Sequence, residues 1–251
     1  MTRAETTAIA VVNLGCVAYA QAEELQRGLV GRRKREEIGD VLLLLEHPPV
    51  VTLGRNARAG NVLASAEELR RRGVELAHCD RGGDVTYHGP GQLVGYPILD
   101  LRRLGMGPVA YMRALEEAHI QVAAGFGLSA GRIAGKTGVW LAGPPRKLVA
   151  MGIHVSRGVT SHGFALNVTP DLELFRQLIV PCGLAGYEVT SLERELGRTV
   201  AMAPVRRAVV WQLGRALARP TVAVSSLEAL NQRLAPRNGN AAPHRHDDLI
   251  A

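Results

Sequence analysis

The chain has 251 residues, of which 47% are hydrophobic and 4% aromatic, so it can bury a sizeable, mainly aliphatic core in one large domain or two small ones. Its net charge of +7 favours an acidic partner. Nucleic acid is disfavoured as that partner, because few aromatic side chains are present to stack on bases and no nucleic-acid-binding motif is recognised.

Cysteine usage and the N-terminal residues indicate where the protein works. Cys16, Cys79 and Cys182 are odd in number and widely spaced, which argues against a disulfide framework and for a reducing compartment. The apolar run 9–20 ends in Ala18-Tyr19-Ala20, which resembles a signal cleavage site, but no positively charged region precedes it. We therefore expect a strand followed by a helix there, no membrane-spanning segment, and a cytoplasmic protein.

The N-terminal half of the chain predicts a mixture of helices and short strands. In order, these are a basic amphipathic helix over 19–35, a buried strand over 41–45, a helix opened by the capping box 65–68 and closed by Gly73, and strands over 74–79 and 96–99. A glycine-rich segment, 81–95, lies between the last two strands.

The C-terminal half continues this mixture. It predicts a helix from Pro108 with Tyr111, Leu115, Val122 and Phe126 on one face, strands over 139–141 and 148–155, a helix with Thr169 as a cap and Pro170 in its first turn, and helices over 190–197, 205–218 and from Ser225. The elements do not alternate strictly as βαβ units, so we expect a mixed α/β domain (α+β type) rather than a doubly wound one. This single domain should span 1–235, and the polar residues 236–251 should form a disordered tail with His244 and His246 solvated.

The glycine-rich segment 81–95 has two readings. Gly89-Pro90-Gly91 is a turn signal and is typical of a hairpin. Glycines in a strand also mark places where a ligand approaches the backbone closely. We favour a ligand site, because a turn alone does not need Gly82-Gly83 as well.

Residues 131–137 resemble a Walker A phosphate-binding loop, but the spacing does not fit. That loop needs a glycine where this chain has Ala130, and it leads into a helix, whereas 139–141 is typical of a strand. We therefore discount phosphate binding and interpret Lys136 as a loop lysine.

Cys182 and Lys147 are the residues of greatest chemical interest. Pro181 and Gly183 hold the thiol on a turn that another molecule can approach. Lys147 is predicted to begin a half-buried strand, and an ammonium beside Cys182 would make the thiol a nucleophile at neutral pH. The residues alone leave structural roles open, because most free cysteines are small buried side chains and a lone histidine such as His162 is more often structural.

Five motifs occur in one order along the chain: 44–55 (LLEHPPVVTLGR), 81–92 (RGGDVTYHGPGQ), 146–147 (RK), 161–167 (SHGFALN) and 179–183 (IVPCG). Together they resemble the lipoyl(octanoyl) transferases, a family of the biotin/lipoate protein ligase-like superfamily, over roughly residues 10–215. The resemblance implies a mixed β-sheet flanked by helices. It also implies an enzyme that transfers an octanoyl group from octanoyl-acyl carrier protein to a lysine of lipoyl domains in lipoate biosynthesis.

The resemblance also implies roles for individual residues. By position, Cys182 matches the nucleophile that carries the octanoyl thioester, and Lys147 matches the lysine that lowers its pKa. The implied substrate-binding residues are Arg81, Gly82, Gly83, Asp84, Val85, Thr86, Tyr87, His88, Ala150, Met151, Gly152, Gly163, Phe164 and Ala165. Asp84 departs from the family, which usually has glutamine there, and we expect it to add a negative charge beside the site. Residues 135–137 also differ from the sequence that the family usually has at these positions.

The implied partners are octanoyl-acyl carrier protein as donor, and as acceptors the lipoyl domains of 2-oxoacid dehydrogenase complexes and the glycine cleavage H protein. Thioester exchange needs no ATP, so we expect no cofactor and no metal, and we expect a monomer. Neutral Lys147, His88 and His162 are candidate bases for the acceptor lysine. Two other functions stay open: an ATP-dependent lipoate or biotin ligase, and a non-catalytic protein that binds acyl groups or lipoyl domains.

Overall fold

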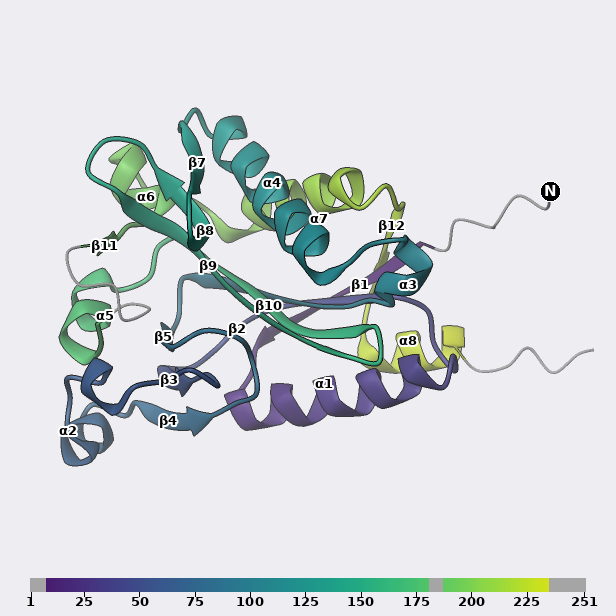
Figure 1. The fold of residues 1–251 in the computed structure, drawn as a ribbon, viewed down its shortest axis with the longest axis horizontal. Coiled ribbons are helices and arrows are strands. Elements are labelled where there is room, and N and C mark those ends of the chain that lie inside the picture. Colours follow the sequence, from purple (N-terminus) through teal and green to yellow (C-terminus); the bar gives the residue numbers. More distant parts are fainter. Residues whose placement is uncertain (1–7, 181–186, 235–251) are drawn as a thin grey trace, which may run out of the picture.

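The computed structural model describes residues 8–180 and 187–234 (Figure 1). In chain order the elements are β1 (Ile9–Cys16), α1 (Tyr19–Lys34), β2 (Val41–Glu46), β3 (Val50–Leu53), the 3₁₀ helix η1 (Ala59–Asn61), α2 (Ala66–Arg71), β4 (Glu75–His78), β5 (Val85–His88), β6 (Gln92–Ile98), α3 (Leu101–Leu104), α4 (Pro108–Gly125), β7 (Ala130–Ile133), β8 (Lys136–Leu141), β9 (Arg146–Ser156), β10 (Val159–Asn167), α5 (Leu172–Leu178), β11 (Glu188–Val189), α6 (Leu192–Leu196), α7 (Met202–Ala216), β12 (Thr221–Val224) and α8 (Leu227–Leu234). No helix within these two stretches has both the length and the apolar character needed to cross a bilayer.

A large mixed sheet forms the centre of the molecule. Its strand order is β12-β1-β2-β6-β10-β9-β8-β7, and β11 pairs with β9, which gives nine strands among the described residues. β12, β1 and β2 run parallel, whereas each neighbouring pair from β2 to β7 is antiparallel. Helices α4 and α7 cover one face, and α1 and α8 cover the other (Figure 1). The predicted mixed sheet flanked by helices is therefore confirmed.

The sequence of β2 shows why helices are needed on both faces of the sheet. Leu42 and Leu44 belong to the core on the side of α4 and α7. Val41, Leu43 and Leu45 belong to the core on the side of α1. Because successive side chains of a strand point to opposite faces, an unbroken apolar run requires cover on both sides.

A second, smaller sheet has the order β4-β3-β5. The chain leaves the large sheet after β2 and returns through Gly89-Pro90-Gly91, which connects β5 to β6. This turn is therefore not a hairpin, because β5 pairs with β3 whereas β6 pairs with β2 and β10. The small sheet packs with α2 and α5 around a separate core that includes Val51, Leu69, Tyr87 and Phe175.

Most predicted helices and strands agree with the structure, with two corrections at helix starts. Asp171, not Thr169, caps α5, and its side chain accepts a hydrogen bond from the backbone N–H of Leu174 (2.9 Å). α7 begins at Met202, three residues before its predicted start. Pro204 is tolerated there because the N–H groups of a first helical turn have no intrahelical partner.

The sequence does not predict the short helix α3 or the strands β3, β5, β7, β10, β11 and β12, and β10 matters most for the site. Its residues at 161–163 are polar or glycine, so the sequence lacks the apolar pattern of a strand, although β10 is almost entirely buried. His162 within it has a φ of 54°, in the left-handed region. Its backbone N–H donates to Oε1 of Gln26 on α1 (2.8 Å), so a long-range contact holds a conformation that local preferences disfavour.

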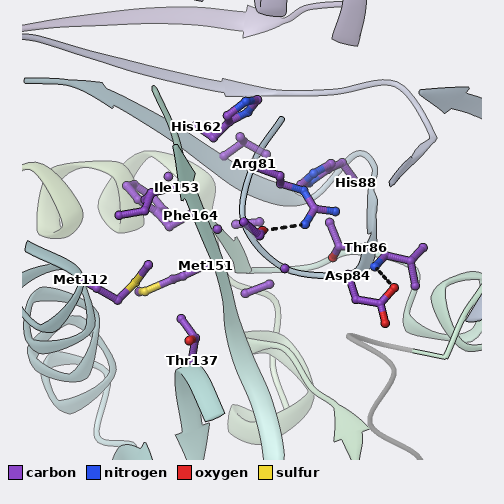
Figure 2. A pocket seen from close by; sticks show the side chains of 18 of the residues that line it. Arg81, Asp84, Thr86, His88, Met112, Thr137, Met151, Ile153, His162 and Phe164 are labelled. Carbon is purple, nitrogen blue, oxygen red and sulfur yellow. Dashed lines mark hydrogen bonds between the residues drawn. The ribbon is translucent and has the colours of Figure 1, made fainter. Parts of the chain in front are cut away.

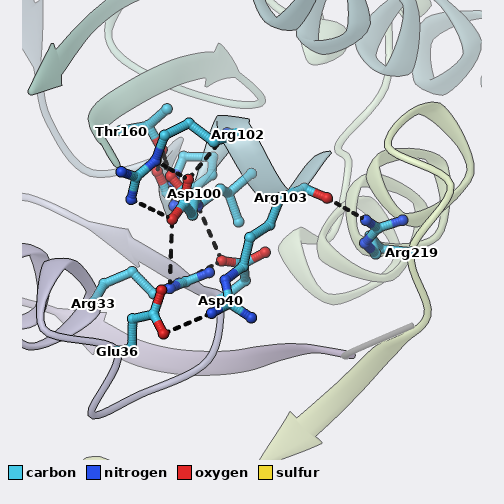
Figure 3. A network of polar contacts seen from close by, with 10 residues as sticks. Arg33, Glu36, Asp40, Asp100, Arg102, Arg103, Thr160 and Arg219 are labelled. Carbon is cyan, nitrogen blue, oxygen red and sulfur yellow. Dashed lines mark hydrogen bonds and ion pairs between the residues drawn. The ribbon is translucent and has the colours of Figure 1, made fainter. Parts of the chain in front are cut away.

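A buried ion-pair network ties α1 to the strands beside it (Figure 3). Arg33 Nε lies 2.8 Å from Asp40 Oδ1, and Arg33 Nη1 lies 3.8 Å from Asp100 Oδ2. Arg102 Nη2 contacts the same Asp100 oxygen at 2.7 Å. Both carboxylates are buried, and each has a cation beside it, as buried charges require.

Candidate active site

A cavity of about 340 Å³ lies where the glycine-rich segment meets β9 and β10. It is lined by Tyr19, Arg81, Gly82, Gly83, Asp84, Val85, Thr86, His88, Val94, Tyr96, Met112, Gly135, Lys136, Thr137, Lys147, Ala150, Met151, Gly152, Ile153, His162, Gly163, Phe164 and Ala165. Its walls therefore come from both sheets and from α1 and α4. The cavity thus brings together segments that are far apart in the chain.

Figure 2 shows that the cavity has two chemically different sides. Arg81, Thr86 and His88 lie on one side. Met112 and Met151 lie on the other, where Ile153 and Phe164 extend the apolar lining. Such a cavity suits a ligand with one polar end and one apolar end.

Glycines let the strands around the cavity approach one another closely. The N–H of Gly82 donates to the carbonyl of Ile153 (2.9 Å). A Cβ on Gly152 would lie 2.5 Å from the carbonyl oxygen of Gly82, and one on Gly163 would lie 2.4 Å from that of Gly95. Any larger residue at 152 or 163 would have to push backbone aside, so glycine is required there by packing.

Arg81 is anchored to the small sheet. Its Nη2 donates to the backbone carbonyl of Thr52 (2.8 Å) and to the Thr52 hydroxyl (3.0 Å). Its Nη1 donates to the carbonyl of Gly82 (3.2 Å). The guanidinium is thus a buried, preorganised positive charge in the cavity wall.

Asp84 uses its carboxylate to hold a neighbouring loop. Oδ1 accepts hydrogen bonds from the backbone N–H of Arg58 (3.0 Å) and of Val85 (2.8 Å). Oδ2 accepts from the side-chain amide of Asn61 (2.5 Å). The charge expected to stand beside the site is therefore engaged by scaffold donors on the loop 58–61.

His88 is a buried, neutral histidine in the cavity wall. Its Nδ1 lies 2.7 Å from Oε1 of Gln92. Burial, with His47 nearby, lowers the pKa of His88 to about 3. The ring is therefore uncharged at neutral pH and can accept a proton only transiently.

His162 lies at the edge of the same cavity, in a different environment. Its Nε2 lies 2.6 Å from Asp80 Oδ1. Burial lowers the pKa of His162, although Asp80 acts in the opposite direction. The ring nitrogen nearest Asp80 is occupied by that carboxylate, which limits what else it can bind.

Lys147 lies on β9 and is buried, with 5% of its surface exposed. Its Nζ stands 4.5 Å from the ring centre of Trp140 on β8. β11 runs parallel to β9 with Val189 opposite Lys147, and Thr190 N–H donates to the Lys147 carbonyl (3.0 Å). Cys182 lies outside the described residues, which stop at Val180 and resume at 187.

The structure brings nearly all the predicted site residues that it describes to this one cavity. Tyr87 is the exception, because alternation along β5 places Thr86 and His88 toward the cavity while Tyr87 packs against Phe175, with ring centres 5.4 Å apart. Lys136, interpreted from the sequence as a loop lysine, lines the cavity at the start of β8. Its Nζ lies 4.4 Å from the Tyr187 ring.

Sequence reasoning also missed Tyr19, Val94, Tyr96, Met112, Gly135, Thr137 and Ile153 as lining residues. Met112 shows why. It follows the core residue Tyr111 by one position on α4, so helical spacing alone places it beside the buried stripe, not toward a cavity. Only the packing of α4 against β7 and β8 shows that Met112 reaches the site.

The arrangement of the two sheets and their helices is that of the lipoate-protein ligases. A crystal structure of lipoate-protein ligase A bound with ATP superposes with a TM-score of 0.70 and 18% identity, over 91% of this chain and 93% of that one. A bi-partite lipoate protein ligase from Thermoplasma acidophilum superposes with a TM-score of 0.68 and 16% identity, over 91% of both chains. At these identities the likeness concerns the fold alone.

Sequence similarity identifies the family of the chain, which the likeness of fold does not. The family model of the lipoyl protein ligase A/B catalytic domain matches residues 18–214, and the chain belongs to this family. An octanoyltransferase of Koribacter versatilis is 53% identical over 209 residues, which is 82% of this chain and 83% of the relative. An octanoyltransferase of Chloroflexus aurantiacus is 52% identical over 206 residues, covering 82% and 92%. The resemblance drawn from the five motifs is confirmed, and these relatives indicate an acyltransferase.

Proposed function

We propose that the protein transfers an octanoyl group from octanoyl-acyl carrier protein to a specific lysine of a lipoyl domain, through a thioester on Cys182. The observation that carries the proposal is the identity of about half the residues to octanoyltransferases, over four fifths of the chain. The cavity supports it. Its buried Lys147, its neutral His88 and its apolar side are what such a transfer requires.

In the first step the Cys182 thiolate attacks the carbonyl carbon of the octanoyl thioester. A new C–S bond to Cys182 forms, the bond to the carrier sulfur breaks, and the carrier leaves as a thiolate that takes up a proton from water. In the second step the neutral amine of the acceptor lysine attacks the octanoyl-Cys182 carbonyl. The C–N bond forms, the thiolate leaves, and the amine proton passes to a base.

Lys147 is the proposed activator of that thiolate. A cysteine at its ordinary pKa of about 8.5 is only a few per cent ionised at pH 7, so a neighbouring ammonium increases the reactive fraction. Val189, seven residues after Cys182 in the chain, pairs directly with Lys147 across β11 and β9. The described backbone that resumes after the cysteine, at 187–189, therefore lies beside the lysine.

The apolar side of the cavity is the proposed site of the octanoyl chain. Burying each methylene there contributes about 0.8 kcal/mol of binding free energy. Met112 from α4 and Met151 from β9 are flexible side chains that can adapt to an alkyl chain. Arg81 and His88, opposite them, are left for the polar thioester end.

Intact mass spectrometry after incubation with octanoyl-acyl carrier protein tests the proposal. The wild-type chain should gain one octanoyl group, and Cys182→Ser should gain none. Cys16→Ser and Cys79→Ser are matched controls that should still be acylated. The assignment of the nucleophile is wrong if the adduct survives Cys182→Ser. Labelling by free octanoate that needs ATP and persists in Cys182→Ser would instead show a ligase.

A further inference from the structure

A buried chain of side-chain amides connects His88 to the strand that follows it and to β10. His88 Nδ1 lies 2.7 Å from Gln92 Oε1, and Gln92 Nε2 donates to Asn167 Oδ1 (2.9 Å). Asn167 Nδ2 in turn donates to the backbone carbonyl of Thr190 (2.9 Å). His88, Gln92, Asn167 and Thr190 are all buried. Apart from His88, no member of this hydrogen-bond chain lines the cavity.

Backbone carbonyls at two points determine the direction of every hydrogen bond in this chain. A carbonyl oxygen can only accept, and Gln92 Nε2 also donates to the carbonyl of Tyr87 (3.2 Å). The NH₂ group of Gln92 must therefore face Tyr87 and Asn167, and its Oε1 must face His88. The Thr190 carbonyl determines the orientation of Asn167 in the same way.

The orientation of the Gln92 amide determines which ring nitrogen of His88 carries the proton. Since Gln92 Oε1 can only accept, His88 Nδ1 must carry the proton and donate it. In a neutral imidazole the other nitrogen, Nε2, then holds the lone pair. Of the two histidines that line the cavity, only His88 has its Nδ1 engaged by this amide chain, whereas His162 directs Nε2 to Asp80.

We propose that Gln92 and Asn167 are positioning residues that hold His88 in its Nδ1–H tautomer, so that Nε2 accepts the proton of the acceptor lysine in the second step. This inference rests on the proposed function. It selects His88 among the three candidate bases. The same hydrogen-bond chain also connects His88 to Lys147, because the N–H of Thr190 donates to the backbone carbonyl of Lys147.

The groups around His88 favour a neutral ring and a free lone pair. Tyr19 of α1 stacks on it with ring centres 6.4 Å apart, and His47, which precedes β3, lies at 5.7 Å. Arg81 of the glycine-rich segment and His162 of β10 disfavour a charge on the ring. These groups keep the ring uncharged and its lone pair free at neutral pH, and any proton that it takes up is short-lived.

The tautomer can be measured without any substrate. In protein labelled with ¹⁵N-histidine, long-range ¹H–¹⁵N correlation spectra distinguish Nδ1–H from Nε2–H, and His88→Gln assigns the signal. We expect Nδ1–H in the wild type and in the control Gln121→Leu, whose amide is exposed on α4. Gln92→Leu should lose the fixed tautomer. An unchanged Nδ1–H signal in folded Gln92→Leu would overturn the proposal.

The two steps of the reaction provide a second readout. Gln92→Leu and Asn167→Leu should leave acylation of Cys182 unchanged and slow transfer to the lipoyl domain by roughly tenfold or more, because general bases contribute about 10²–10⁴-fold. An equal loss in both steps would show a merely structural role and contradict the proposal. If the wild type forms no adduct, the proposed function fails while the tautomer measurement still stands.

Gln92→Glu keeps the test decisive if the leucine variants do not fold. One carboxylate oxygen can still accept from Nδ1–H, so the tautomer should remain, whereas the other oxygen cannot donate to Tyr87 and Asn167 as the amide does. The added negative charge favours a protonated ring, which raises the pKa of His88. The pH at which the second step loses its base should therefore move upward, and an unmoved profile would count against His88 as the base.

Discussion

Lys147 combines burial with a positive charge, and its proposed role predicts a pH-dependent defect. Without the ammonium the Cys182 thiol should return toward its ordinary pKa of about 8.5. If the lysine lowers that pKa by one unit, Lys147→Ala should slow adduct formation about tenfold at pH 7. The rate should recover as the pH rises above 8.5, because the thiol then ionises unaided.

The rate of adduct formation between pH 6 and pH 9.5, followed by intact mass, measures this effect. Lys34→Ala is the matched control, since Lys34 donates to Ser156 on β9 and does not line the cavity. A defect in Lys147→Ala of equal size at every pH would mean that the lysine binds substrate without activating the thiol.

Asp84 is predicted to stabilise a loop and not to act on the substrate. In Asp84→Asn, an NH₂ group would face one of the three N–H donors that the carboxylate now satisfies. We expect a loss of about 1–3 kcal/mol in the free energy of unfolding, measured by urea denaturation. Transfer activity in the folded fraction should change little. A catalytic defect at unchanged stability would show instead that the carboxylate serves the reaction.

At the scale of elements, the contact between the glycine-rich segment and β9 shapes the cavity. A Cβ at residue 152 would lie 2.5 Å from the Gly82 carbonyl, and that oxygen belongs to backbone that cannot simply rotate away. Gly152→Ala should therefore displace the segment that carries Arg81 and lower the rate of adduct formation by at least about tenfold, as misplaced reacting groups do.

Gly131→Ala is the control for this change, because a Cβ there meets nothing within 4 Å and Gly131 also lies in a strand, β7. It should leave adduct formation and stability close to the wild type. Equal activity of the two variants would contradict the view that close backbone approach at 152 determines the shape of the site.

Helix α4 is predicted to limit the length of the acyl chain. Met112 lies on the apolar side of the cavity, so Met112→Ala should leave space for further methylenes. We expect the preference for decanoyl over octanoyl donor to rise by about tenfold, the usual discrimination per methylene or two in an apolar pocket. Competition between the two donors, read by adduct mass, measures it. Met106→Ala, outside the cavity lining, should not change the ratio.

At the scale of the whole molecule, the ion-pair network at the end of α1 holds the layers together (Figure 3). Asp100→Asn would leave the buried Arg33 with one carboxylate instead of two and should destabilise the fold by about 1–3 kcal/mol, because Asp40 still compensates the charge of Arg33. Glu173→Gln, which breaks the exposed pair with Arg176, should change stability by less than about 1 kcal/mol. Urea denaturation at pH 7 compares the two variants.

The effect of Asp100 should depend on pH with a definite sign. The hydrogen-bonded Arg102 holds the pKa of Asp100 below its ordinary value of 3.8. A lowered pKa contributes stability that is present above the ordinary value and is lost as the pH falls through the folded-state value. The difference in stability between wild type and Asp100→Asn should therefore shrink below about pH 4. A constant difference down to pH 3 would contradict this account.

Much of the fold could be predicted because its signals are local. The capping box at Ser65 and the four-residue spacing of Tyr111 and Leu115 on one helix face involve residues within a turn or two of one another. The unbroken apolar run of β2 likewise indicated a strand covered on both faces. β10 could not be predicted, because its polar residues are satisfied by partners such as Gln26 and Asp80, far away in the chain.

Residue patterns along the chain were enough to predict the mixed α/β class, the family, and the candidate residues in five ordered motifs. The three-dimensional arrangement was needed to show that Tyr87 faces a separate core, that Lys136 and Met112 line the cavity, and that Asp84 holds a loop. This division arises because motifs and caps depend on neighbouring residues, whereas strand register and the packing of one sheet on another depend on contacts across the whole chain. The hydrogen-bond chain from His88 to Asn167 is of the second kind, and no local pattern could have revealed it.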